Sequence, residues 1–231
     1  AALAGLSQIT ATVLLVFLFS LRNFAVGSTY ARTETLLTAI VGALFFHEAL
    51  AGAGWIAIAI GVLGVMLINL ARTGIGGDNL LRRLFFQPAA GVGLASGLGF
   101  AGASLFLRQA SLSLGLDDWL YAAAVTLAMV LLIQTVMMSL YIVFRARDQL
   151  VAMMPNWRGC LFVGITSVVG SAGWFTALTV ERAAYVKALG QVELLFTLAL
   201  SVLFFKERST SKELSGMALV AGSIVVLLLF G

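Results

Sequence analysis

The sequence predicts an all-α membrane protein, a polytopic helical bundle of about eight transmembrane helices with inverted repeats. Composition is the first reason, because 61% of the residues are hydrophobic, 10% are charged and the mean hydropathy is +1.06. An ordinary soluble domain has about 45–50% apolar and about 25% charged residues. The second reason is that several nearly uncharged runs are about 20 residues long, the length that a helix needs to cross a bilayer core. The third is an internal repeat with an offset of 159 residues.

Eight apolar segments have lengths close to a membrane span, and short connections separate them. They are residues 3–21, 27–47, 52–71, 88–107, 119–144, 159–180, 184–205 and 212–230. Strands of a membrane barrel would be about 10 residues long and would alternate in polarity, so these long uniform runs favour helices. The stretch 74–87 is rich in glycine and arginine, which is typical of a loop. We therefore expect a linker there, between a first, incomplete repeat at residues 1–73 and a second repeat at residues 88–231.

The repeat is clearest in the run from Glu34 to Glu48, which returns as the run from Glu193 to Glu207. The offset is the same at both ends, because 193 − 34 and 207 − 48 both equal 159, and 7 of the 15 positions are identical. The same offset carries the first three spans onto the last three and leaves the fourth and fifth without counterparts. An odd number of crossings separates the two copies, so we expect them to run in opposite directions. Inverted repeats are common in secondary transporters, with the binding site between the repeats.

Glu34 and Glu193 are the strongest candidates for a functional site. If Glu48 ends its helix and caps the turn that follows, Glu34 lies about 21 Å away, within the hydrocarbon core. A carboxylate at that depth costs a few kcal/mol or more unless it faces water or a partner. Thr38 and Thr197 each follow a carboxylate by four residues and share its helix face. We predict that the two Glu-xxx-Thr faces line a cavity; a purely structural ion pair or interhelical hydrogen bond is the alternative.

Four further residues complete the predicted substrate-binding set. Arg32 corresponds to Gln191 at the same offset, so the two repeats differ chemically near the expected cavity. Trp174 and Tyr121 are amphipathic side chains of the kind that usually anchors a protein at the membrane interface, and both are also candidates for ligand contact. Lys187, by contrast, is expected to reach the membrane interface with its ammonium group.

Other kinds of site have little support. His47 is the only histidine, so neither a HExxH zinc motif nor a separate Ser-His pair can be assembled, and no catalytic residue, metal or cofactor is expected. Gly97, Gly99 and Gly102 match the GxGxxG pattern, but they lie in an apolar span with no strand before it, so close helix packing explains them better. The 14 Lys and Arg residues are spread over short connections, which argues against nucleic-acid binding. The single cysteine, Cys160, has no partner for an internal disulfide.

The repeated segments resemble the EamA-type transporters of the drug/metabolite transporter superfamily. The residues that carry the resemblance are GALFFHE and SVLFFKE, each followed by a short turn and a glycine-bearing span, WIAIAIGVLGVMLI and GMALVAGSIVVLLL. The resemblance covers essentially the whole chain. It implies ten helices in two inverted five-helix repeats, of which the first two helices are expected to be missing here. It also implies a multi-pass protein of the bacterial inner membrane, with a substrate cavity lined by the helices of Glu34 and Glu193.

Two functions stay open at this point. The first is a secondary transporter that exports or exchanges small metabolites or drugs by alternating access; its partners would be a small-molecule substrate and the lipid bilayer, and its oligomeric state is undefined. The second is a non-transporting integral membrane protein, an assembly partner or membrane enzyme with a duplicated helical core, in which Glu34 and Glu193 are buried in direct pairs. Orientation is open as well. Ten basic residues on one side against three on the other place both chain ends outside by the positive-inside rule, whereas the family resemblance places them inside.

Overall fold

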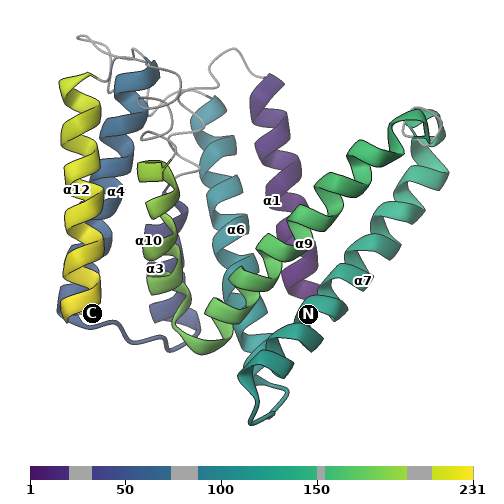
Figure 1. Ribbon diagram of the computed structural model, residues 1–231, viewed down its shortest axis with the longest axis horizontal. Helices are drawn as coiled ribbons and strands as arrows, with labels where there is room; N and C mark the ends of the chain where they lie inside the picture. The colour runs from purple at the N-terminus through teal and green to yellow at the C-terminus, as the bar shows by residue number, and fades with distance from the viewer. Residues whose placement is uncertain (21–32, 74–87, 150–153, 197–209, 231) are drawn as a thin grey trace.

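The structure is a computed structural model of the chain, and it describes residues 1–20, 33–73, 88–149, 154–196 and 210–230. In these ranges the chain is helical and forms no β-strand (Figure 1). The elements are α1 (Ala2–Ser20), α3 (Glu34–Phe45), α4 (Gly52–Thr73), α6 (Pro88–Leu112), α7 (Trp119–Arg145), the short 3-10 helix η1 (Met154–Asn156), α9 (Trp157–Val180), α10 (Ala183–Gly190) and α12 (Ser211–Phe230).

The helices have the length and composition of membrane spans. Within the described residues, α6, α7, α9 and α12 are long and apolar enough to cross a bilayer, and α1, α3 and α4 contribute shorter apolar stretches. Large apolar side chains on the outer surface, such as Phe144 on α7 and Phe162 on α9, are exposed. Exposure of these side chains to water would be unfavourable. In a membrane, apolar side chains on the outer surface are expected because they face lipid. The chain is a polytopic all-α membrane protein, as the sequence predicts.

Two predicted spans differ from the helices of the structure. The expected single span at 184–205 is interrupted, because α10 ends at Gly190, Gln191 forms a turn and helix resumes at residues 192–196. The fourth span was expected to end near residue 107, but α6 continues to Leu112. Arg108 therefore lies in a helix and not in a connection. Hydropathy alone placed the helix end at this charged residue. The helix can continue past Arg108 because Glu48, from another part of the chain, pairs with its charge.

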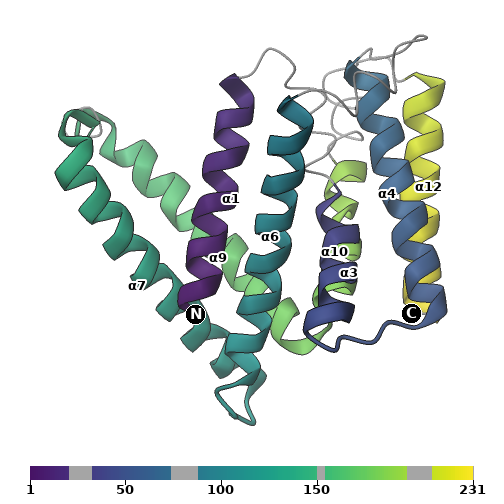
Figure 2. The same cartoon turned by 180° about the vertical axis from the view of Figure 1, so that it is seen from behind.

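The repeated elements run in opposite directions. α4 begins at Gly52 and α12 at Ser211, which is the offset of 159 found in the sequence (211 − 52). α4 runs upward and α12 downward in Figure 1, and the view from behind in Figure 2 agrees. The counterparts α1 and α9 are also opposed: α1 runs upward and α9 downward. The inverted arrangement predicted from the number of crossings is therefore present in the structure.

Small residues bring the helices of the bundle into close contact. α1 packs on α6 where a Cβ on Gly99 would lie 2.8 Å from the Cβ of Ala11, and the Ser7 hydroxyl donates to the Gly99 carbonyl at 2.7 Å. α4 packs on α12 through Gly64 and Gly216, since a Cβ on either glycine would lie 2.8 Å from the carbonyl oxygen of the other. Lipid gives helices little hydrophobic reason to associate, so close backbone approach and interhelical hydrogen bonds must hold them together. The glycine motif of α6 is thus a packing motif.

The short helix α10 lies at the centre of the molecule. Ala183 and Val186 belong to an apolar cluster with residues of α6, α7 and α9. Ala184, Tyr185 and Ala188, on the other side of the helix, belong to a cluster with residues of α3, α4 and α12. A helix that is buried on both sides can place its few polar side chains with little freedom. This position decides where Lys187 and the following Gln191 lie.

Candidate functional site

A cavity of about 340 Å³ lies between the segment before the predicted linker and the segment after it. We call these the N-terminal segment (residues 1–73) and the C-terminal segment (residues 88–231). The N-terminal segment lines the cavity with residues of α1, α3 and α4, and the C-terminal segment with residues of α6, α9, α10 and the turn that follows α10. Its polar lining residues are Gln8, Glu34, Thr35, Ser104, Ser171, Trp174, Lys187, Gln191 and Glu193. The volume is sufficient for a small organic molecule.

An ion pair joins the two segments inside this cavity. The Lys187 ammonium lies 2.5 Å from a carboxylate oxygen of Glu34, and the two side chains are 18% and 22% exposed. Glu34 is the first residue of α3, where the helix dipole favours a negative charge. The same ammonium lies 4.9 Å from the centroid of the Trp174 ring, in cation–π geometry. We call Glu34 and Lys187 the cavity pair.

Gln191 makes a second polar link across the cavity. Its side-chain amide donates to the Thr35 hydroxyl at 3.0 Å, and the residue is 8% exposed. Gln191 holds this position because it forms the turn between α10 and residues 192–196. Glu193 follows two residues later, lines the cavity and is exposed. The interruption of the helix thus brings one amide and one carboxylate to the wall of the cavity.

Four of the sequence-predicted site residues meet at this cavity, namely Glu34, Trp174, Gln191 and Glu193. Thr38 does not line it, because its side chain is fully buried and its hydroxyl donates to the Glu34 carbonyl within α3. Tyr121 is also absent from the lining; it lies in the first turn of α7 with 59% of its surface exposed. Arg32 and Thr197 lie outside the described residues.

Sequence reasoning missed several residues of the cavity, among them Lys187 and Gln8. Lys187 was expected to reach the membrane interface, and it turns inward to Glu34. Gln8 was not considered; it lines the cavity and accepts a hydrogen bond from the Gln134 side chain at 2.9 Å. Depth along the helix gave no signal for Lys187, because 20 residues before Glu207 correspond to about 30 Å, which places the lysine at the far edge of the hydrocarbon core. Among the described residues, no three side chains of His, Cys, Asp or Glu gather as a metal ion would require.

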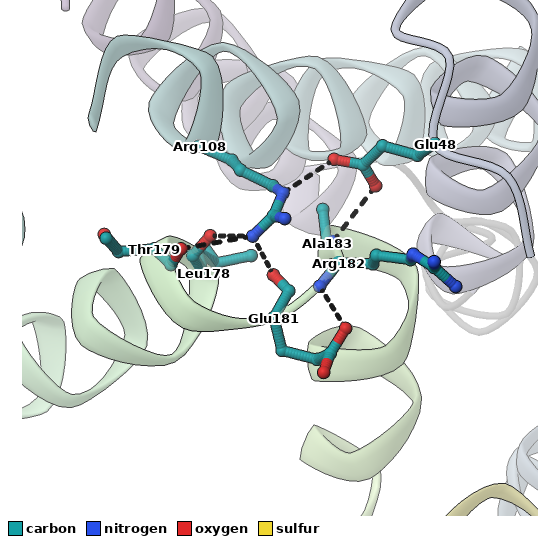
Figure 3. Close-up of polar contacts among 7 residues, drawn as sticks. All are labelled: Glu48, Arg108, Leu178, Thr179, Glu181, Arg182 and Ala183. Atoms are coloured by element: carbon teal, nitrogen blue, oxygen red, sulfur yellow. Dashed lines mark hydrogen bonds and ion pairs between the residues drawn. The ribbon is translucent and has the colours of Figure 1, made fainter. Parts of the chain in front are cut away.

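A second charged group joins the two segments at the end of the bundle where α9 gives way to α10 (Figure 3). The Arg108 guanidinium donates from Nε to Glu48 at 3.0 Å and from Nη1 to the carbonyls of Leu178, at 2.8 Å, and of Glu181. The last carbonyls of a helix have no partner within the helix. Arg108 donates to carbonyls at this end of α9 and to that of Glu181, which follows it, so it stabilises the turn there.

Glu48 performs the corresponding task for the start of α10. Its second carboxylate oxygen accepts the backbone N–H of Ala183 at 3.1 Å. Burial raises the pKa of the Glu48 carboxyl above its ordinary value of 4.5, against the opposing influence of Arg108. The sequence predicted that Glu48 caps the turn into its own next span; it caps a helix of the other segment instead, because the bundle packs α10 against α3. We call Glu48, Arg108, Leu178, Glu181 and Ala183 the junction cluster.

These features define a polytopic helical membrane protein with a polar cavity between two inverted segments. The model of the EamA-like transporter family matches residues 87–229, more than half of the chain, and the chain belongs to this family. This match confirms the resemblance noted in the sequence. Members of the family are membrane transporters rather than enzymes, and the family supports a transporter role for this chain.

Comparison with solved structures supports the same fold. A crystal structure of a protein superimposes with a TM-score of 0.73 over 99% of this chain and 77% of that chain, at 15% sequence identity. At that identity the likeness shows a shared fold. None of the curated proteins matches this chain in sequence.

Proposed function

We propose that this chain is a secondary transporter that exports or exchanges small metabolites or drugs by alternating access between two inverted repeats. The observation that carries the proposal is the cavity itself, which both segments line with ionisable and hydrogen-bonding side chains. The proposed repeats are residues 1–73 and 88–231, joined by a linker at 74–87. The proposed location is the cell membrane, in a bacterium the inner membrane.

The junction cluster supports this mechanism, because it ties the two segments together at one end of the bundle. Glu48 comes from the N-terminal segment and Arg108 from the C-terminal segment. A carrier that alternates between two open states must close one end of its cavity while the other is open. The junction cluster is suited to hold one end closed, and the opposite state of the cycle requires Glu48 and Arg108 to separate.

The test is transport by the full-length protein in liposomes. Vesicles are loaded with labelled amino acids, amines, carboxylic acids and nucleosides, and efflux is compared with that of protein-free vesicles. We expect accelerated efflux for at least one class and its loss in the double variant Glu34→Gln with Glu193→Gln. Asp148→Asn is the matched control, because Asp148 is exposed and lies outside both the cavity and the junction cluster. Absence of accelerated efflux for every class would contradict the proposal, and unchanged flux in the double variant would remove the two carboxylates from the mechanism.

One observation favours the second candidate, a non-transporting membrane protein with a duplicated core. Glu34 is held in a direct ion pair, as a purely structural carboxylate would be. Solvent access separates the two candidates. In a Cys160→Ser background, which removes the exposed native cysteine, Ser171→Cys on the cavity wall is treated with a water-soluble thiol reagent, with the fully buried Thr38→Cys as the control. Labelling at position 171 alone supports a hydrated cavity, and equal protection of both positions favours the packed core.

A further inference from the structure

Three side chains from three different helices converge at one wall of the cavity. Glu34 begins α3, Trp174 belongs to α9 and Lys187 to α10. The Lys187 ammonium lies 2.5 Å from the Glu34 carboxylate and 4.9 Å from the centroid of the Trp174 ring. A carboxylate beside an aromatic face is the arrangement by which proteins bind alkylammonium ions, since both groups attract a cation and the ring also contacts its carbon atoms. In this structure the cation is part of the protein.

We propose that Glu34 and Trp174 form a binding subsite for the ammonium group of an amine substrate, and that Lys187 occupies this subsite when no substrate is bound. This inference rests on the proposed function and names the substrate class of the same cavity. A substrate amine enters by displacing the Lys187 ammonium from Glu34. Lys187 is therefore an internal competitor, attached to the protein by its own side chain.

The surroundings favour a cationic substrate group over an anionic one. An anion bound to Lys187 would draw the ammonium away from Glu34 and leave that carboxylate, which is 22% exposed, without its counter-ion. It would also face the negative π surface of Trp174 and a second lining carboxylate, Glu193. A cation that replaces Lys187 keeps the charge balance at Glu34 unchanged and frees the lysine to move into the hydrated part of the cavity.

The remaining wall suggests the body of the substrate. Phe100, Leu107 and Phe175 supply apolar surface, and Ser104 and Ser171 supply hydroxyl groups. A cavity of about 340 Å³ accommodates a compact aromatic or aliphatic amine. The amine class is thus set by Glu34 and Trp174, while the apolar wall contacts the rest of the molecule.

Internal competition has a measurable consequence. A site that is available for only a fraction of the time has an apparent affinity reduced by that fraction, so a subsite that Lys187 fills about 90% of the time weakens amine binding about tenfold. Lys187→Met removes the competing ammonium and keeps a similar side-chain length. We therefore expect this substitution at a binding-site position to tighten amine binding by about tenfold, whereas loss of an ordinary contact residue would weaken it.

The experiment measures equilibrium binding by calorimetry on the full chain in lipid nanodiscs. The probes are 2-phenylethylamine, phenylacetate and phenylacetamide, which have similar shapes and a positive, a negative and no charge. In the wild-type protein we expect the amine to bind more tightly than the other two. Lys187→Met should tighten the amine alone, and Lys212→Met, which removes an exposed lysine at the start of α12, should have no effect. Unchanged or weaker amine binding in Lys187→Met, or a wild-type preference for phenylacetate, would overturn the proposal.

Further variants test the roles of Glu34 and Trp174 directly. Adding Glu34→Gln to Lys187→Met restores a neutral pair and should abolish the preference for the amine. Trp174→Leu should weaken amine binding more than Trp174→Phe does, and Trp157→Leu, at an exposed position on α9, should leave it unchanged. Retention of the amine preference in the double variant would contradict the role of Glu34. Amine binding that responds to the variants in this way, without efflux from liposomes, would refute the transporter and support the amine subsite. Efflux from liposomes without these binding responses would support the transporter and refute the amine subsite.

Discussion

The cavity pair and the junction cluster are similar in burial but differ in the number of groups around each charge. Glu34 and Lys187 are 22% and 18% exposed, and Glu48 and Arg108 are 12% and 15% exposed. In the junction cluster, Arg108 also donates to the carbonyls of α9, and Glu48 also accepts the Ala183 N–H. In the cavity pair, within the described part of the chain, Lys187 contacts the Glu34 carboxylate and the uncharged face of the Trp174 ring.

This difference separates an ion pair that also holds backbone structure from one whose cation a ligand can replace. Each charge of the junction cluster also pairs with backbone groups, so its removal leaves several partners unpaired. Among the described residues the cavity pair has few additional partners, and it faces a space that water or a ligand can enter. The number of backbone groups that depend on an ion pair is therefore a better guide to its role than its burial. Four predictions test this comparison, from the largest expected effect to the smallest.

Arg108→Met should have the largest effect on stability. The substitution leaves Glu48 without its counter-ion and the last carbonyls of α9 without a donor, so we expect the free energy of unfolding to fall by about 3 kcal/mol. The measurement is a reversible unfolding titration with sodium dodecyl sulfate in detergent micelles. Arg158→Met, at an exposed position near the start of α9, is the control. A loss as small as that of the control would show that the junction cluster does not hold the α9–α10 turn.

Lys187→Met should destabilise the protein by less than about 1 kcal/mol, as for an ion pair with access to water. The reason is that Glu34 faces the cavity, where water can hydrate a carboxylate that has lost its partner. The same titration measures the effect, next to Arg108→Met. If the two substitutions had equal effects, the cavity pair would be as structural as the junction cluster, and the comparison would fail.

Glu48→Gln should change stability by no more than about 0.5 kcal/mol near neutral pH, although it lies in the junction cluster. The amide oxygen can still accept a hydrogen bond from Arg108, which also keeps its bonds to the carbonyls of Leu178 and Glu181, and the cost of burying the Glu48 carboxylate disappears. Because burial raises the pKa of Glu48 in the folded state, its stabilising contribution is complete below the unfolded pKa of 4.5 and is lost as the pH rises through the folded pKa. Wild-type stability relative to Glu48→Gln should therefore decrease as the pH is raised from 4.5. A difference that increases instead would show that the Arg108 interaction outweighs burial.

Glu181→Gln should have the smallest effect, within about 0.5 kcal/mol. Glu181 is exposed, and its side-chain oxygen accepts the Arg182 N–H at 2.8 Å, a bond that the amide oxygen of glutamine can also accept. Only the backbone carbonyl of Glu181 belongs to the junction cluster. Thermal unfolding in detergent checks this expectation, and a clear loss of stability would assign the exposed carboxylate a role that the contacts do not suggest.

Much of the fold was predictable because its signals are local or periodic. The long apolar runs predicted the helices, and the offset of 159 predicted that α4 and α12 run in opposite directions. Depth along the helix predicted that Glu34 faces a cavity, and the repeat placed Glu193 with it. For Thr38, a spacing of four residues placed the side chain on the Glu34 face of the helix, but it could not specify which residue of that face meets a neighbouring helix. The extent of α6 and the turn at Gln191 were also not predictable from hydropathy.

The sequence by itself determined that the chain is a polytopic membrane protein with two opposed copies of one acidic unit, because hydropathy and repetition are properties of the chain that survive any packing. Only the tertiary structure decided which groups neutralise those acids. Lys187 meets Glu34, and Arg108 meets Glu48, because the turn between α9 and α10 inserts a short helix between the two segments. Such pairings depend on where helices that are distant in sequence cross. In a low-dielectric environment the attraction between opposite charges is strong, so a buried charge pairs with the opposite charge that the crossing brings close to it.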